Sequence, residues 1–84
     1  MTISDLRRII DELDEQILHL LNERALAARQ IGLLKKNLGL PVYDPEREEA
    51  VLAAKVAQNA GPLHGEQIRA IFEKIIAGCR ELQG

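Results

Sequence analysis

The sequence is poor in large aromatic side chains and in cysteine. Its 84 residues include one Phe, one Tyr, no Trp and one Cys. A single cysteine forms no intrachain disulfide, and with two distant histidines it offers no metal-ligand cluster. The largest core-filling side chains are nearly absent, yet 46% of the residues are hydrophobic, mostly Leu, Ile and Ala. This combination favours helices that bury an apolar stripe against another chain.

Charge and hydropathy exclude further classes of protein. The formal net charge is −2 and no basic patch contains interleaved aromatic residues, so nucleic acid is not an expected partner. No apolar run approaches the roughly 20 residues that a membrane-spanning helix needs, and the N-terminus has no apolar signal segment. We therefore expect a soluble, cytoplasmic protein that uses no metal and no cofactor.

The clearest pattern in the sequence predicts a first helix over about residues 3–38. Thr2 and Asp5 are spaced as an approximate capping box, and Gly39 followed by Pro41 is a stop signal. Such a helix is roughly 54 Å long, too long to be covered by the rest of an 84-residue chain. A second copy of the chain is the simplest partner. The stripe alternates steps of four and three, as in a heptad repeat, through Leu6, Ile10, Leu13, Ile17, Leu20, Arg24, Ala27, Ile31, Leu34 and Leu38.

Two shorter helices are predicted after the first. Asp44 is a suitable N-cap and Pro45 suits the first helical position, so the second helix covers about 45–59. The third covers about 65–83. No strand pattern or repeat is present, and the sequence therefore predicts one all-α domain over residues 1–84.

Arg24 is the one polar residue in the apolar stripe of the first helix. It either extends its charge to solvent, pairs with a carboxylate across an interface, or binds a ligand. Lys35 lies three turns further on nearly the same face, whereas Arg7 is roughly 25 Å back along the axis. If two antiparallel copies cross near residue 20, the partner's Arg7 comes opposite residue ~33, between Arg24 and Lys35. Three cations then surround one pocket, twice per dimer, which suits a small dicarboxylate.

Other polar residues allow both a structural and a functional interpretation. Asp44 is expected to cap the second helix, and Glu48 is either a solvated first-turn acid or a ligand-binding group. Arg47 beside it has the same ambiguity. Gln83 is either solvated at the chain end or functional, and Cys79 is expected to be a small core residue without a base partner.

Gly32 interrupts the first helix at a cost of roughly 1 kcal/mol relative to alanine. A helix or a ligand passing close to the backbone would explain it, and so would neutral drift.

Three segments of the sequence resemble the all-helical chorismate mutases: LRRIIDELDEQILHLLNERALAARQIGLLKK, PVYDPEREEAVL and IFEKIIAGCRELQ. The similarity covers essentially the whole chain and is strongest to the mutase domain of bifunctional chorismate mutase–prephenate dehydratases. The motifs in register are Asp14, the N-E-R ending in Arg24, Gly32, Lys35, the D-P-x-R-E of 44–48 and Gln83. The resemblance implies an intertwined helical homodimer with two active sites that convert chorismate to prephenate without a cofactor.

The resemblance also implies roles for individual residues. Arg7 from the partner chain and Arg24 would hold the substrate carboxylates. Lys35 would bind a carboxylate and the ether oxygen, which Gln83 would reach from the other side. The ring hydroxyl would be bound by Glu48 and the Asp44 region. Cys79 matches a position that is often a small or hydroxyl residue, so its hydrogen bond would be weak, and Tyr43 stands where some relatives have a basic residue.

Two other functions fit the same family. Isochorismate pyruvate lyases share the fold and a similar cationic pocket, and a mutase-like domain can also serve as a non-catalytic dimerisation or regulatory module. The set Arg7, Arg24, Lys35, Glu48 and Gln83 argues against a purely structural domain. A fused or associated enzyme of the same pathway is a further possible partner.

Overall fold

The computed structural model describes all 84 residues and contains three α-helices and no strand. Helix α1 spans Ile3–Leu38, α2 spans Pro45–Gln58 and α3 spans Gly65–Gln83. The predicted all-α class with one long and two shorter helices is confirmed. The second helix ends one residue earlier than the sequence pattern indicates, at Gln58.

The ends of α1 are fixed by local side-chain and backbone chemistry. The Thr2 hydroxyl accepts from the Asp5 N–H and the Asp5 carboxylate accepts from the Thr2 N–H, which completes the predicted capping box. At the other end Gly39 adopts φ 69°, a left-handed conformation that costs other residues free energy. Its N–H donates to the carbonyls of Lys35 and Lys36 and ends the helix.

The two shorter helices begin with local hydrogen bonds between side chain and backbone. Asp44 accepts from the N–H of Arg47 at 3.1 Å, and Pro45 occupies the first turn of α2. At the start of α3, the N–H of His64 donates to the Gln67 side chain at 2.9 Å. These caps set the point at which the chain enters each helix.

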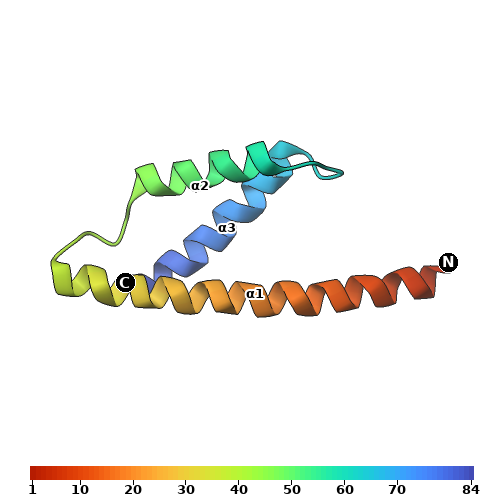
Figure 1. Cartoon of the computed structure of the whole chain (residues 1–84), viewed down its shortest axis with the longest axis horizontal. Coiled ribbons are helices and arrows are strands. Elements are labelled where there is room, and N and C mark those ends of the chain that lie inside the picture. The colour runs from red at the N-terminus through yellow and green to blue at the C-terminus, as the bar shows by residue number, and fades with distance from the viewer.

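The helices fold back over one half of α1 only. Figure 1 shows α2 and α3 above the C-terminal half of α1, with α3 running diagonally between the other two, while the N-terminal half of α1 extends alone. Helix α3 packs against both α1 and α2, which do not pack directly against each other. The radius of gyration is 15.8 Å, against about 12 Å for a compact domain of this length.

The single chain has very little core. Only five residues are buried: Ala28, Gly32, Leu52, Ile76 and Cys79. By contrast, the large apolar residues of the α1 stripe lie 47% to 70% exposed, Leu38 being the most exposed of them. An apolar surface this extensive on a folded chain marks an interaction site. No helix combines the length and the apolar character that crossing a membrane requires.

Candidate active site

A cavity of about 390 Å³ lies between the C-terminal half of α1, the start of α2 and the end of α3. Its size falls in the range of small-molecule binding sites, roughly 300–1,000 Å³. The structure brings together six of the seven predicted site residues in its lining: Arg24, Lys35, Asp44, Glu48, Cys79 and Gln83. Arg47 and Arg80 also line it, together with the apolar side chains of Ala27, Ala28, Ile31, Val42, Val51 and Ile76.

Arg7 is the predicted site residue that this cavity does not contain. It is exposed on the N-terminal half of α1, seventeen residues before Arg24, or about 26 Å along the helix axis. Nothing in the single chain folds over that half of α1, as Figure 1 shows. Within one chain, Arg7 therefore cannot share a small ligand with Arg24 and Lys35.

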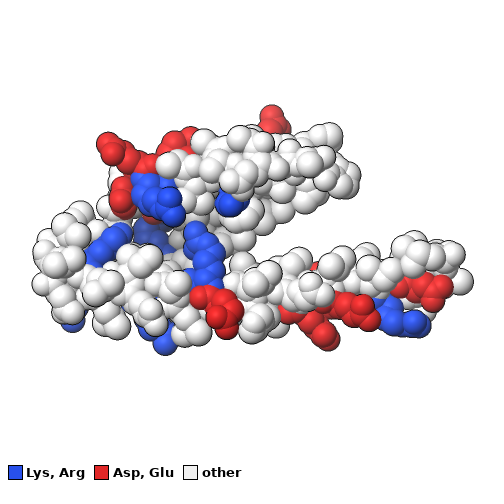
Figure 2. All heavy atoms as spheres, viewed as in Figure 1, with Lys and Arg blue, Asp and Glu red and all other residues white.

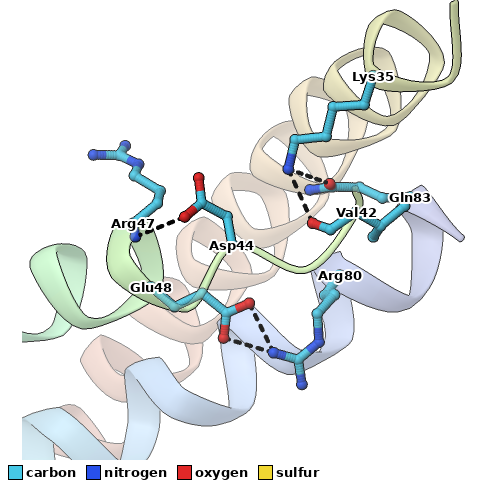
Figure 3. A network of polar contacts seen from close by, with 7 residues as sticks. All are labelled: Lys35, Val42, Asp44, Arg47, Glu48, Arg80 and Gln83. Carbon is cyan, nitrogen blue, oxygen red and sulfur yellow. Dashed lines mark hydrogen bonds and ion pairs between the residues drawn. The ribbon is translucent and has the colours of Figure 1, made fainter. Parts of the chain in front are cut away.

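Lys35 and Gln83 form the end of the cavity nearest the 39–44 loop. The Lys35 Nζ donates to the Val42 carbonyl at 2.9 Å and to the Gln83 Oε1 at 3.3 Å (Figure 3). Both acceptors are neutral, so no carboxylate of the chain pairs with the lysine. The oxygen of the Gln83 amide faces the lysine. The NH₂ group of the same amide forms no hydrogen bond within the chain and is available as a donor.

Glu48 is tied to an arginine that sequence reasoning missed. The Arg80 Nη1 donates to both Glu48 carboxylate oxygens, at 2.6 and 2.7 Å, and the Arg80 guanidinium lies 5.1 Å from the centre of the Tyr43 ring. This hydrogen bond raises the pKa of Arg80 above its ordinary value. Glu48 is half-buried, so the interpretation as a freely solvated first-turn acid is wrong for this structure. Arg80 could have been noticed because it lies three residues before Gln83, on the same face of α3.

Asp44 serves the fold and also lines the cavity. Its Oδ1 caps α2 at the Arg47 N–H, as expected, while the carboxylate stays exposed. The Arg47 side chain lines the cavity from the first turn of α2, although Figure 3 shows its guanidinium directed away from Lys35 and Gln83. Cys79 is a free, buried thiol, which agrees with its interpretation as a small core residue.

The charges in the cavity are not balanced within the chain. Arg24, Lys35 and Arg47 form no ion pair with any carboxylate of the chain, whereas Arg80 is paired with Glu48. Figure 2 shows blue side chains gathered where α1, α2 and α3 meet, and mainly acidic ones along the N-terminal half of α1. The lining contains four cationic side chains and two carboxylates, and this excess of positive charge favours an anionic ligand.

A larger hollow of about 930 Å³ lies at the other end of α2 and α3 but lacks this chemistry. Its single arginine, Arg69, is held by Glu49 at 2.6 Å and by Glu73 at 3.1 Å. The hydrogen bond from Arg69 lowers the pKa of Glu49, which keeps that carboxylate ionised. This hollow therefore has no unpaired arginine or lysine to offer an anion.

The fold and the site together define a class: an all-helical protein with a cation-lined cavity for a small anion. The sequence profile of the family described as chorismate mutase type II matches residues 6–84. The chain therefore belongs to the type II chorismate mutase family, and the resemblance noted in its sequence is confirmed.

Individual relatives support the same assignment. The bifunctional chorismate mutase/prephenate dehydratase of Aquifex aeolicus is 39% identical over 85 residues, covering 96% of this chain and 24% of the relative. The form II structure of chorismate mutase from Thermus thermophilus has a TM-score of 0.95 at 43% identity, covering 96% of this chain and 92% of that one. A chorismate mutase from Helicobacter pylori in complex with prephenate has a TM-score of 0.87 at 30% identity, covering 96% and 88%. The chain spans between 20% and 24% of the bifunctional relatives.

The charge distribution predicts opposite stability effects for two arginines of the cavity. Arg24→Ala should leave the thermal unfolding midpoint unchanged or raise it, because no carboxylate of the chain loses a partner and cation repulsion falls. Arg80→Ala should lower the midpoint, because the half-buried Glu48 loses its ion pair. Thermal unfolding followed by circular dichroism measures both. An equal loss of stability in Arg24→Ala would show that Arg24 is a structural ion-pair residue.

Proposed function

We propose that this chain is a chorismate mutase that converts chorismate to prephenate, the first committed step toward phenylalanine and tyrosine, in the cytoplasm. The observation that carries the proposal is the set of three cations without carboxylate partners, gathered in the helical cavity of a family member. Chorismate carries two carboxylates, an ether oxygen and a ring hydroxyl. The cavity offers cations for the carboxylates, N–H donors for the ether oxygen and carboxylate acceptors for the ring hydroxyl.

The reaction is a rearrangement within one molecule. The ether C–O bond breaks while a C–C bond forms, and no proton has to move. The enzyme's task is to hold the flexible substrate in a compact conformer and to stabilise the negative charge that develops on the ether oxygen. Fixed cations and amide donors do both, because they are already oriented when the charge appears.

Each cavity residue has a role in this proposal. Arg24 and the Arg7 of a second chain bind the two carboxylates. Lys35 donates to a carboxylate and to the ether oxygen, and the free NH₂ group of Gln83 donates to the same oxygen. One fixed donor of this kind is worth about 10²–10³ in rate.

The remaining contacts orient the ring. Glu48 and Asp44 accept the ring hydroxyl, since each carboxylate retains lone pairs beyond those used by Arg80 and by the α2 cap. Cys79 lies buried at the cavity wall and contributes at most a weak S–H hydrogen bond. Arg47 adds positive charge at the entrance.

The site is complete only in an intertwined homodimer. The chain exposes 6817 Å², about 1,800 Å² more than the roughly 5,000 Å² expected for a compact protein of 9.4 kDa. The excess coincides with the apolar stripe of α1, which has no partner within the chain. An antiparallel second copy would cover this stripe and bring its Arg7 to the cavity.

The proposed activity is tested by adding chorismate and following its absorbance, with the product identified chromatographically. Prephenate is the expected product, and Lys35→Ala is the inactive control. Salicylate plus pyruvate from isochorismate would instead identify the lyase activity of related proteins. No turnover of either compound would leave a binding or regulatory domain and would contradict the proposal.

The exposed α1 stripe predicts an obligate dimer. Sedimentation at micromolar concentration should give about twice the chain mass of 9.4 kDa. Leu20→Asp, a charge in the middle of the stripe, should shift the species toward monomer and remove activity with it, because a buried unpaired carboxylate is costly. A folded, active monomer of the unmodified chain would contradict the shared site.

The placement of Arg7 predicts complementation between two inactive chains. Arg7→Ala and Lys35→Ala should each be nearly inactive alone, since each site lacks one cation. Mixed in equal amounts and refolded, half of the dimers contain one chain of each kind, and each of these has one intact site. Activity should recover to about a quarter of the unmodified enzyme. No recovery, with mixed dimers verified by mass spectrometry, would contradict a site shared between Arg7 of one chain and Lys35 of the other.

The role of Gln83 predicts a pH dependence that the unmodified enzyme lacks. An amide donates at every pH, but the carboxylate of Gln83→Glu has no donor when ionised and repels the ether oxygen as it gains charge. The variant should be poorly active at neutral pH and should recover as the pH falls and the introduced carboxyl becomes protonated. Rates measured from about pH 4 to 9 test this, with Gln83→Ala as the control that stays low throughout. A pH profile identical to that of the unmodified enzyme would show that Gln83 is a solvated helix end.

A further inference from the structure

Gly32 marks the closest approach of α3 to α1. A methyl group at this position would lie 2.7 Å from the Cα of Gln83, 2.9 Å from its Cβ and 3.1 Å from its carbonyl oxygen. Non-bonded carbon atoms normally stay about 3.5–4.0 Å apart. Gly32 is buried and lies inside α1 with ordinary helical geometry, so the backbone conformation does not require glycine. What the missing side chain provides is space for Gln83.

The atoms that approach Gly32 are fixed parts of Gln83. Its Cα and carbonyl oxygen belong to the backbone, and the Cβ cannot swing away by a change of rotamer. A larger residue at position 32 therefore displaces the last turn of α3 as a whole. Gln83 is the final residue of that helix, and its turn is held by this contact with α1 and by the ion pair of Arg80 with Glu48.

The same face of α1 also holds the Gln83 side chain. Lys35 lies three residues after Gly32, so the two share one face of the helix. The Lys35 Nζ hydrogen bonds to Oε1 and leaves the amide NH₂ free (Figure 3). The backbone of Gln83 thus rests on Gly32 while its amide oxygen is held by Lys35.

We propose that Gly32 is a positioning residue for Gln83. It lets the end of α3 lie close enough to α1 for the amide to reach Lys35 and present its NH₂ group to the substrate. This inference rests on the proposed mutase activity and on the role of Gln83 in it. Gly32 itself touches neither the substrate nor the reacting atoms.

The proposal gives a specific kinetic expectation for Gly32→Ala. Normal contact distances require the end of α3 to move by about 1 Å, and a misplacement of that size can cost about 10²-fold in rate. The turnover number should fall by about 10- to 100-fold, with a much smaller change in KM, because Gln83 acts on the charge that develops during the reaction. Gly78→Ala is the matched control: this glycine is exposed inside α3 and has no atom within 4 Å of the added methyl.

A double-mutant cycle separates positioning from a general effect on the fold. Kinetics are measured for Gly32→Ala, Gln83→Ala and the double variant, with dimer content and thermal midpoint recorded for each. If Gly32 acts through Gln83, Gly32→Ala should have almost no effect on turnover once Gln83 is alanine. An equal loss in both backgrounds, or normal turnover in Gly32→Ala, would overturn the proposal. Full activity of Gln83→Ala would instead refute the role given to Gln83. If the unmodified chain does not convert chorismate, the proposed function itself is refuted.

A second variant keeps the test independent of the helix contact. Gln83→Asn leaves Gly32 intact but shortens the side chain by one CH₂ group. With the backbone fixed against α1, the shorter amide cannot reach Lys35, so activity should fall toward that of Gln83→Ala. Full activity in Gln83→Asn would show that the end of α3 adjusts freely and would overturn the proposal.

Discussion

An excess of positive charge that the chain does not neutralise is the feature on which the cavity depends. Arg24 and Lys35 lie on one helix, about 16 Å apart along its axis, which fixes the spacing of their backbone positions. Lys35 is held by two neutral oxygens rather than by a carboxylate, and the one nearby glutamate is occupied by Arg80. The fold thus places these cations in the cavity without neutralising them, and in the proposed activity the substrate carboxylates would balance their charge.

Much of the fold was readable from the sequence because it depends on local rules. The Thr2 capping box, the Gly39 stop and the Asp44 cap act within a few residues of the chain, and each is present in the structure. Whether Gly32 reflects close packing or neutral drift could not be decided from neighbouring residues. It depends on where the end of α3 crosses α1, fifty residues further along the chain.

The candidate site was predictable to the extent that polar residues interrupted an apolar pattern. Arg24 stands out in the α1 stripe, and the family resemblance supplied the others. Arg80 does not interrupt an apolar pattern, because a charged residue near the end of a helix is ordinary, and its spacing to Gln83 was the one available hint. Its importance appears only when α2 brings Glu48 within 2.6 Å of it. An ion pair between two helices, such as this one, depends on how α2 packs against α3. The spacing of residues along one helix does not predict that packing.

The position of Tyr43 has an optical consequence. The chain has no tryptophan and a single tyrosine, so its tyrosine fluorescence originates from one ring per chain. That ring lies 5.1 Å from the Arg80 guanidinium, which in turn holds Glu48 at the cavity. The tyrosine emission of each chain therefore reports on one edge of the site, and changes at this edge can be followed without an attached dye.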